Sequence, residues 1–367
     1  MKSDMNRKNY YFNGQVTAET QISVNRPNDN FKSLTGSDKL LRLPRQGSKK
    51  DGTPVFIPGD TIRGTLRRCG ENFIRRQIVK LTNQTKPFSI DDLYMLRQGV
   101  DTRNKIIYEK TDGLMSSESN LRDINPFLSL FGRWKLSGHL GVGNLYPMSE
   151  DVIFINSKGV RTNDYIRSPE QIRFLREEDV ERVKKMILED SDASRGKVEI
   201  NKQISQLMSD FENTSDATEK FNISNAINEL KAKRDSLNDS KTGSKDSIQR
   251  PLEGHEAIKP GTIFSHRINL NLANDLELGL LLLCIREFTR APFIGAQSRT
   301  SSGEISGFYD ILCWEEDSDA PITLGRLNFS INGFSITEEI EGSLIPTTEL
   351  FLSELNQSKF DFTKYLI

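Results

Sequence analysis

The sequence is poor in cysteine and histidine, with three residues of each among 367. Cys69, Cys284 and Cys313 lie far apart, and each has apolar neighbours in the sequence. Neither a disulfide framework nor a CxxC metal site can be built from such a set. The sequence therefore predicts buried thiols in a reducing cytoplasm, with no metal site and no cofactor.

Long apolar runs are also missing. The longest, residues 276–285, is shorter than the roughly 20 residues that a membrane-spanning helix needs, and it contains Glu277. Residues 1–8 are polar and charged, unlike a signal peptide. We therefore expect a cytoplasmic protein with no membrane partner.

The chain has almost no net charge, because 50 basic residues face 51 acidic ones. The basic residues are nevertheless concentrated between residues 39 and 76, where three acidic residues interrupt ten basic ones. Such a segment is either the solvated side of a helix or one basic face that binds a polyanion. The ten basic residues are Lys39, Arg42, Arg45, Lys49, Lys50, Arg63, Arg67, Arg68, Arg75 and Arg76.

Residues 55–68, VFIPGDTIRGTLRR, form the most informative stretch of the sequence. A short apolar run leads into a Pro-Gly turn, after which Asp60 or Thr61 is expected to cap a helix that ends near residue 81. An apolar stripe follows the helical repeat, and arginines cover the other sides. Free backbone N–H groups at a helix start, beside guanidinium groups, favour phosphate binding. The stripe is Ile62, Leu66, Cys69 and Phe73.

The order of expected elements predicts an α+β fold with a ferredoxin-like, RNA-recognition-motif palm and large inserted thumb and finger segments. Two β-α-β halves are expected, with both helices on one face of the sheet. The palm is predicted to comprise residues 1–155 and 255–367. Residues 156–254 are highly charged and read as an inserted helical region, with helices at 169–189 and 198–237.

A second glycine-containing segment, residues 293–302 (FIGAQSRTSS), precedes the final core strand. Gly295 permits a backbone conformation that other residues avoid, and the polar residues after it offer hydrogen-bond donors. A segment of this kind is either an ordinary turn or a wall of a phosphate site. The interpretation as a phosphate site is favoured, because this loop and residues 57–64 each flank a helix of the same inferred β-α-β repeat.

These two segments resemble the repeat-associated (RAMP) superfamily of CRISPR proteins, through IPGDTIRGTLR at 57–67 and IGAQSR at 294–299. Within that superfamily the chain is most similar to the backbone subunit of type IV effector complexes. Ala296 replaces the second glycine of the family's usual glycine loop. The resemblance covers about residues 10–155 and 255–314.

The resemblance implies a non-catalytic, antiviral RNA-binding subunit whose copies stack as a helical filament along a CRISPR guide RNA. The ribonucleoprotein would contain other effector subunits and would pair its guide with target nucleic acid. A thumb projecting after residue 156 would touch the RNA through Tyr165, Arg161, Arg167 and Arg173, which are otherwise exposed helix residues. The implied RNA-binding residues are Arg42, Arg45, Gly59, Thr61, Arg63, Arg67, Arg161, Arg167, Gly295, Gln297, Ser298 and Arg299.

Two other functions remain open on the sequence. Type III-like backbones cut target RNA with an acidic loop residue, and Asp29 in RPNDN lies in the comparable loop, where a plain turn residue is also expected. A guide-processing ribonuclease would use a histidine as general acid or base. His139 is a better candidate than His255 or His266, and His266 is expected to lie in the core. A structural module without nucleic acid is the third possibility.

Overall fold

Strand β1 (Lys8–Ala18) is central to an antiparallel sheet in this computed structural model, and it pairs with β10 (Ile263–Ala273) and β11 (Ile305–Trp314). The structure describes residues 7–24, 30–32, 39–46, 54–84, 87–100, 102, 120–156, 159–161, 177–214, 216–239, 250–252, 255–296, 298, 301–315 and 318–364. The mixture of helices and antiparallel strands is an α+β fold, as the sequence predicted.

The sheet has seven strands, in the order β13-β12-β11-β1-β10-β4, with β5 also paired to β10. All of these pairings are antiparallel. After β11 the chain forms a hairpin of β12 and β13. The remaining strands are β4 (Leu140–Val142), β5 (Tyr146–Pro147), β12 (Ile322–Ser330) and β13 (Gly333–Glu338).

The alternation of β10 gives the sheet one buried and one open face. Phe264, His266, Ile268 and Leu270 are buried, whereas the residues between them are exposed or half-buried. Leu272 departs from this alternation, because it has φ +48° and is 60% exposed. A left-handed residue breaks the alternation at the end of the strand.

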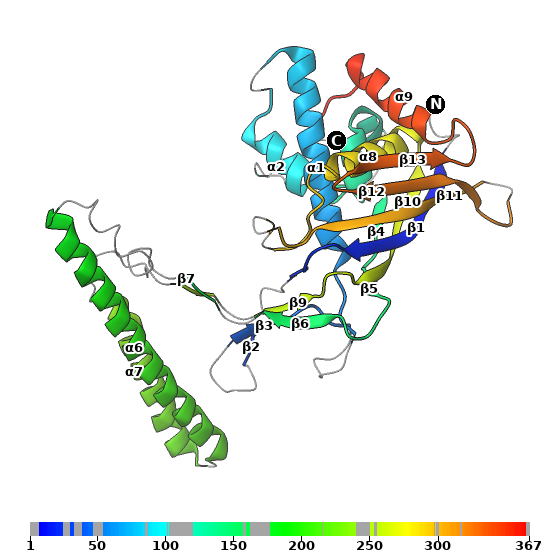
Figure 1. Ribbon diagram of the computed structural model, residues 1–367. Coiled ribbons are helices and arrows are strands. Elements are labelled where there is room, and N and C mark those ends of the chain that lie inside the picture. The colour runs from blue at the N-terminus through cyan, green and yellow to red at the C-terminus, as the bar shows by residue number, and fades with distance from the viewer. Residues whose placement is uncertain are drawn as a thin grey trace. The chain divides into compact units, whose positions relative to one another are not determined.

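Two helices cover the buried face, and both lie behind β11 and β12 in Figure 1. Helix α8 (Asp275–Phe288) is apolar almost all round, and Asn274 caps it reciprocally with Glu277. Helix α1 (Gly59–Thr82) buries the predicted Ile62, Leu66 and Phe73, although Cys69 is only half-buried.

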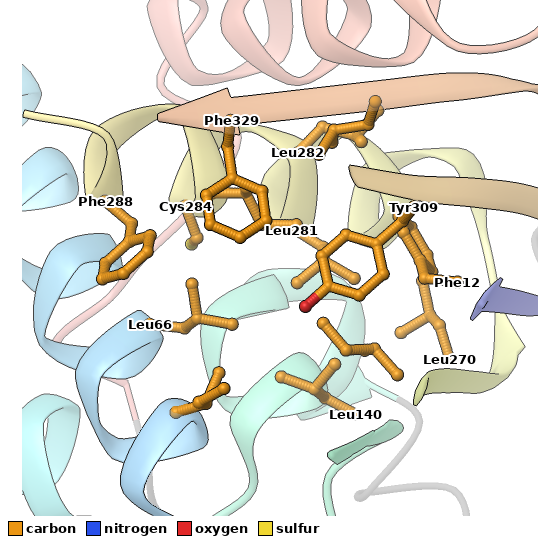
Figure 2. Close-up of a cluster of buried hydrophobic side chains, with 14 of the residues drawn as sticks. Phe12, Leu66, Leu140, Leu270, Leu281, Leu282, Cys284, Phe288, Tyr309 and Phe329 are labelled. Atoms are coloured by element: carbon orange, nitrogen blue, oxygen red, sulfur yellow. The ribbon is translucent and has the colours of Figure 1, made fainter. Parts of the chain in front are cut away.

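The core between sheet and helices is continuous (Figure 2). Leu66 of α1, Leu281 of α8 and Leu270 of β10 all contribute to it. Tyr309 and Phe329 stack with ring centroids 5.8 Å apart. This part of the chain also contains the helices α2 (Ile90–Gln98), α4 (Pro126–Phe131) and α9 (Ile345–Asn356).

The inserted region contains a helical hairpin formed by α6 (Glu177–Asn213) and α7 (Ala217–Asp239). The predicted boundary between helices at 190–197 is wrong, since α6 runs through it and ends at Asn213. Helix α7 packs against α6 so that Ile200, Ile204 and Ile227 bury one another. Residues 169–176 lie outside the described residues.

The chain divides into two compact units. The first comprises Met1–Arg26, Leu43–Phe154 and Ala257–Ile367, and the second Pro27–Arg42 and Ile155–Glu256. Residues 27–42 therefore belong with the insertion rather than with the palm to which the sequence assigned them. The short strands outside the large sheet are β2 (Asn30–Lys32), β3 (Lys39–Leu41), β6 (Ile153–Asn156), β7 (Gly159–Arg161), β8 (Arg250–Leu252) and β9 (His255–Ile258).

Candidate nucleic-acid interface

The start of α1 differs from the predicted cap. The helix begins at Gly59 rather than after Asp60 or Thr61, and Pro58 precedes it without a side-chain cap. The Gly59 N–H donates to Asn144 Oδ1 at 2.9 Å. A Cβ on Gly59 would lie 2.2 Å from the Val142 carbonyl oxygen, so only glycine fits. Gly59 therefore joins the helix to the segment before β5 and has no free N–H for a ligand.

Arg67 occupies the interior and not the surface. It is 6% exposed, and its guanidinium donates to the carbonyl oxygens of Leu96 at 2.6 Å and Met95 at 2.9 Å. A third contact, 3.3 Å long, reaches the Phe131 carbonyl oxygen. These oxygens lie at or near the C-terminal ends of α2 and α4, where helix carbonyls lack partners. The predicted RNA-binding role of Arg67 is therefore replaced by a structural one.

Burial also alters the ionisation of Arg67. Desolvation, together with the nearby charge of Arg63, lowers the pKa of Arg67 to about 10. The side chain still carries its charge at neutral pH, stabilised by the carbonyl oxygens around it. Arg63 donates to the same Phe131 carbonyl oxygen at 2.5 Å, but it stays half-buried and reaches the surface.

The other arginines near this end of α1 are partly exposed. Arg68 Nη2 donates to Thr65 Oγ1 at 3.0 Å, which uses one of its donors. Arg97 Nη2 of α2 lies 2.8 Å from Glu71 Oε2, and Arg75 Nε lies 3.9 Å from the other oxygen. The Glu71 side chain is fully buried, whereas Arg97 is 45% exposed. Glu71 thus orients the Arg97 guanidinium through a hydrogen bond and lies near that of Arg75, and both arginine side chains are partly exposed.

Gly295 has the left-handed backbone that the sequence predicted, with φ +78°. A Cβ there would lie 2.4 Å from the Ser23 carbonyl oxygen, and the N–H of Ala296 donates to that same oxygen at 2.8 Å. The loop is thus fastened to the segment after β1. Ser298 is exposed, while Gln297 and Arg299 lie outside the described residues.

One hollow brings the two glycine-marked segments together. It has a volume of about 400 Å³, and residues from α1, α2 and the 293–302 loop line it. All of them belong to the first unit. The lining residues are Asp60, Thr61, Gly64, Thr65, Arg68, Arg97, Gln98 and Gly295. We call this the α1 hollow.

Arg68, Arg97 and Gln98 are absent from the site predicted on the sequence. Arg68 belongs to the basic run that was noted there, one position after the arginine that was chosen. The helical repeat distinguishes Arg67 from Arg68. Arg67 shares the buried side of α1 with Gly70 and Ile74, which lie one and two turns further along the helix. No sequence pattern linked α2 to this site.

The other predicted contacts lie elsewhere. Arg42 is in the second unit, with Nε 4.0 Å from Glu256 Oε1. Arg45 donates to the Leu43 carbonyl oxygen at 3.2 Å. Arg161 ends β7, where the structure describes its backbone alone. Tyr165, Arg167, Arg173 and the alternative nuclease residue Asp29 lie outside the described residues.

The charge of the hairpin is opposite to that of the α1 hollow. Residues 177–239 contain ten basic and fifteen acidic residues, a net charge of −5. Phosphate groups are repelled by such a surface. The hairpin is therefore a poor candidate for gripping RNA, and the basic residues implied for the thumb precede it in the sequence.

The three histidines do not form a common site. His266 is in the core as predicted, with Nδ1 2.6 Å from Tyr309 Oη and Nε2 3.0 Å from the Gly143 carbonyl oxygen. Burial lowers the pKa of His266 to about 4. His255 Nε2 lies 3.0 Å from Asn156 Nδ2.

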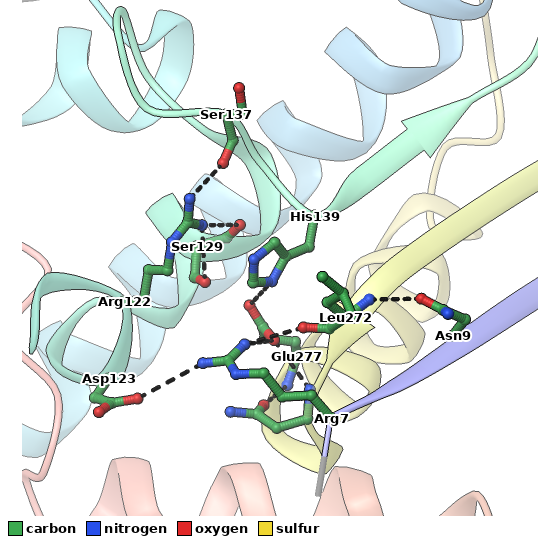
Figure 3. Close-up of polar contacts among 10 residues, drawn as sticks. Arg7, Asn9, Arg122, Asp123, Ser129, Ser137, His139, Leu272 and Glu277 are labelled. Carbon is green, nitrogen blue, oxygen red and sulfur yellow. Dashed lines mark hydrogen bonds and ion pairs between the residues drawn. The ribbon is translucent and has the colours of Figure 1, made fainter. Parts of the chain in front are cut away.

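His139 belongs to a polar network around a buried carboxylate (Figure 3). Its Nδ1 lies 2.8 Å from Glu277 Oε1, and Arg7 Nη1 lies 3.4 Å from the other carboxylate oxygen. Burial alone would raise the pKa of Glu277, but hydrogen bonding and charge from His139, with help from Ser129 and the Asn274 N–H, lower it. Since the same carboxylate caps α8, this network fastens the helix to β1 and to the segment before β4.

No family model matches the chain, and no curated protein matches it. Among the helices that the structure describes, none has the length and apolarity required to cross a membrane. The described side chains also contain no cluster of three or more potential metal ligands.

Proposed function

We propose that this protein is a non-catalytic backbone subunit that binds a CRISPR guide RNA, with copies of itself side by side along the RNA. Its partners would be the guide, the target nucleic acid paired with it, and the other subunits of a type IV-like effector complex. The observation that carries the proposal is the α1 hollow, in which the two sequence segments that suggested the family line one surface.

The chemistry of the α1 hollow suits a sugar-phosphate chain. Arg68 and Arg97 provide charged, planar donor groups, and Thr61 and Gln98 provide neutral ones. Such donors bind phosphate and ribose oxygens without distinguishing between bases. A subunit that must accept any guide sequence needs contacts of this kind.

The topology of the sheet supports a ferredoxin-like palm. Reading β1, α1, β4, β10, α8 and β11 as its six elements gives the sheet order β11-β1-β10-β4, that is, 4-1-3-2. All adjacent pairs in this order are antiparallel, and the helices occupy one face. In this interpretation the β12–β13 hairpin and α9 are additions at the C-terminal end.

The RNA-binding set that we propose therefore differs from the one implied by the resemblance. Thr61, Arg63 and Gly295 remain, Arg68 and Arg97 are added, and Arg67 and Gly59 become structural residues. Gln297, Ser298 and Arg299 continue the loop that carries Gly295 and remain proposed contacts. Arg42, Arg45, Arg161 and Arg167 also remain in the proposal as contacts outside the hollow.

Purification of the full chain from cells that express its guide RNA tests the function. We expect nucleic-acid absorbance to co-purify with the protein, in a large particle that RNase converts into smaller species. A monomer free of RNA would contradict the proposal. Incubation of the particle with labelled complementary RNA would expose a nuclease, because cleavage lost in Asp29→Ala would replace the scaffold by the alternative enzyme.

A further inference from the structure

The open face of the large sheet contains a second hollow, with a volume of about 550 Å³. None of the residues that line it is charged. The side chains that it presents are mainly amides and hydroxyls, together with the Phe308 ring, whereas the Phe329 ring is packed in the core. The lining residues are Gln15, Thr17, Ser306, Gly307, Phe308, Asn328, Phe329, Ser330, Asn332, Gly333, Phe334 and Ser335. We call this the sheet hollow.

The strand register places its key side chains in one row. Phe308 of β11 is opposite Gln15 of β1 on one side and Asn328 of β12 on the other, and Asn328 is opposite Ser335 of β13. Directly opposed residues in a sheet have Cβ atoms about 5 Å apart. Two amide groups therefore flank one aromatic ring on the open face.

This row suits a flat, uncharged, aromatic ligand with hydrogen-bonding edges. Phe308 supplies a ring for stacking on the side that Arg326 does not cover. Each amide side chain offers both donors and an acceptor. Nucleobases have such edges and stack on aromatic side chains. The absence of charge from the lining means that phosphate groups are not drawn into the hollow itself.

Charged groups lie in the neighbouring row of the same face. There, Arg267, Asn13, Asp310 and Arg326 are opposed in order across four strands. Arg326 is bonded to Asp310, with distances of 2.6 and 3.1 Å, and its guanidinium carbon lies 4.6 Å from the Phe308 ring centroid. Arg267 is exposed and bonds only through Nε, to Asn13, among the described residues. Its remaining donors can bind the phosphate attached to a base in the hollow.

We propose that the sheet hollow binds an unpaired base of a single-stranded nucleic acid, stacked on Phe308 and bonded at its edge by Gln15 and Asn328. The sheet hollow and the α1 hollow share no lining residue. The two hollows can therefore be altered by separate substitutions, and this inference goes beyond the proposed function without resting on it.

The test compares two labelled strands that differ only in their bases. One is an oligothymidylate of about 12 nucleotides, and the other is an abasic chain of the same length and charge. Fluorescence anisotropy with the full chain should give about tenfold tighter binding of the strand that has bases. Phe308→Ala should bring the ratio of the two dissociation constants close to one.

Three further variants make the result specific. Asn328→Ala removes an exposed amide and should also lower the ratio, which decides the question if Phe308→Ala does not fold. Phe221→Ala removes a 67% exposed ring from the hairpin and should leave the ratio unchanged. Arg68→Glu with Arg97→Gln should weaken binding of both strands in parallel and keep the ratio, which separates this inference from the proposed function. A ratio near one in the wild type, or an unchanged ratio in folded Phe308→Ala or Asn328→Ala, would overturn the inference.

Discussion

Helix α1 and the α6–α7 hairpin are both rich in charged residues, but they use them differently. Between Gly59 and Thr82, α1 has six basic and two acidic residues, whereas residues 177–239 have ten basic and fifteen acidic ones. In α1, Arg67 and Glu71 are buried and bonded to neighbouring elements. In the hairpin the charged side chains are largely at the surface, as in the Lys184–Glu181 pair.

The comparison shows that the basic side chains of one helix occupy two environments, the interior and the surface. The helical repeat of α1 places some of its charged side chains in the interior, where they bond to α2 and α4. It places others beside the α1 hollow. The hairpin has an apolar seam, and most of the charged side chains that the structure describes there are exposed to solvent, where ion pairs contribute little to stability. The variants below test this difference, beginning with the largest expected effect.

Replacement of the inward-facing arginine should destabilise the protein most. Arg67→Ala leaves the carbonyl oxygens of Leu96, Met95 and Phe131 without this donor and opens a cavity. We expect a loss of about 4 kcal/mol in the free energy of unfolding, measured by urea denaturation. The matched control is Lys202→Ala at an exposed position of α6, which should change the free energy of unfolding by less than about 0.5 kcal/mol. Similar effects of the two variants would contradict the structural role of Arg67.

The hairpin should respond locally to a change in its own core. Ile204→Ala removes a side chain that is 8% exposed and packs in the seam between α6 and α7. We expect the hairpin to lose about 3 kcal/mol of local stability. Hydrogen exchange should accelerate at amides of α6 and α7, while those of α8 keep their protection. The reason is that the hairpin and α8 belong to different compact units. Accelerated exchange in α8 would show that the units unfold together.

A smaller effect is expected from pH. The pKa of Glu277 is lowered in the folded state, so its contribution to stability is present above the unfolded value of about 4.5 and disappears as the pH falls through the folded value. Glu277→Gln should therefore weaken the acid dependence of unfolding over that window. Tryptophan fluorescence follows this change in the first unit, since Trp134 and Trp314 both belong to it. An unchanged acid dependence would contradict the assignment.

Several elements could be predicted because periodicity alone determines them. The alternation of β10, the all-apolar α8 and the stripe of α1 each follow from the spacing of apolar residues. Gly295 was also identified correctly as a residue with a special backbone. These features position the α1 hollow, which lies at the end of α1 that the sequence indicated.

Other features depend on distant parts of the chain and had no local signal. Gly59 must be glycine because Val142 approaches it, and Arg97 joins the site through a carboxylate on another helix. The end of α6 at Asn213 is set by the apolar seam that α6 forms with α7. The helical repeat places Arg67 rather than Arg68 on the buried side of α1, but the carbonyl oxygens that Arg67 bonds come from α2 and α4, which no local pattern indicated.

The central claim is that the α1 hollow, and not overall charge, binds single-stranded RNA. The direct measurement is the salt dependence of RNA affinity for Arg68→Glu with Arg97→Gln, compared with Lys184→Glu with Lys185→Gln on the hairpin. Both pairs lower the net charge by the same amount, and both lysines are more than half exposed. The account predicts at least about tenfold weaker binding for the first pair and a salt slope reduced by about 1.4, from two lost phosphate contacts. Equal weakening by both pairs, or none by the first, would contradict it.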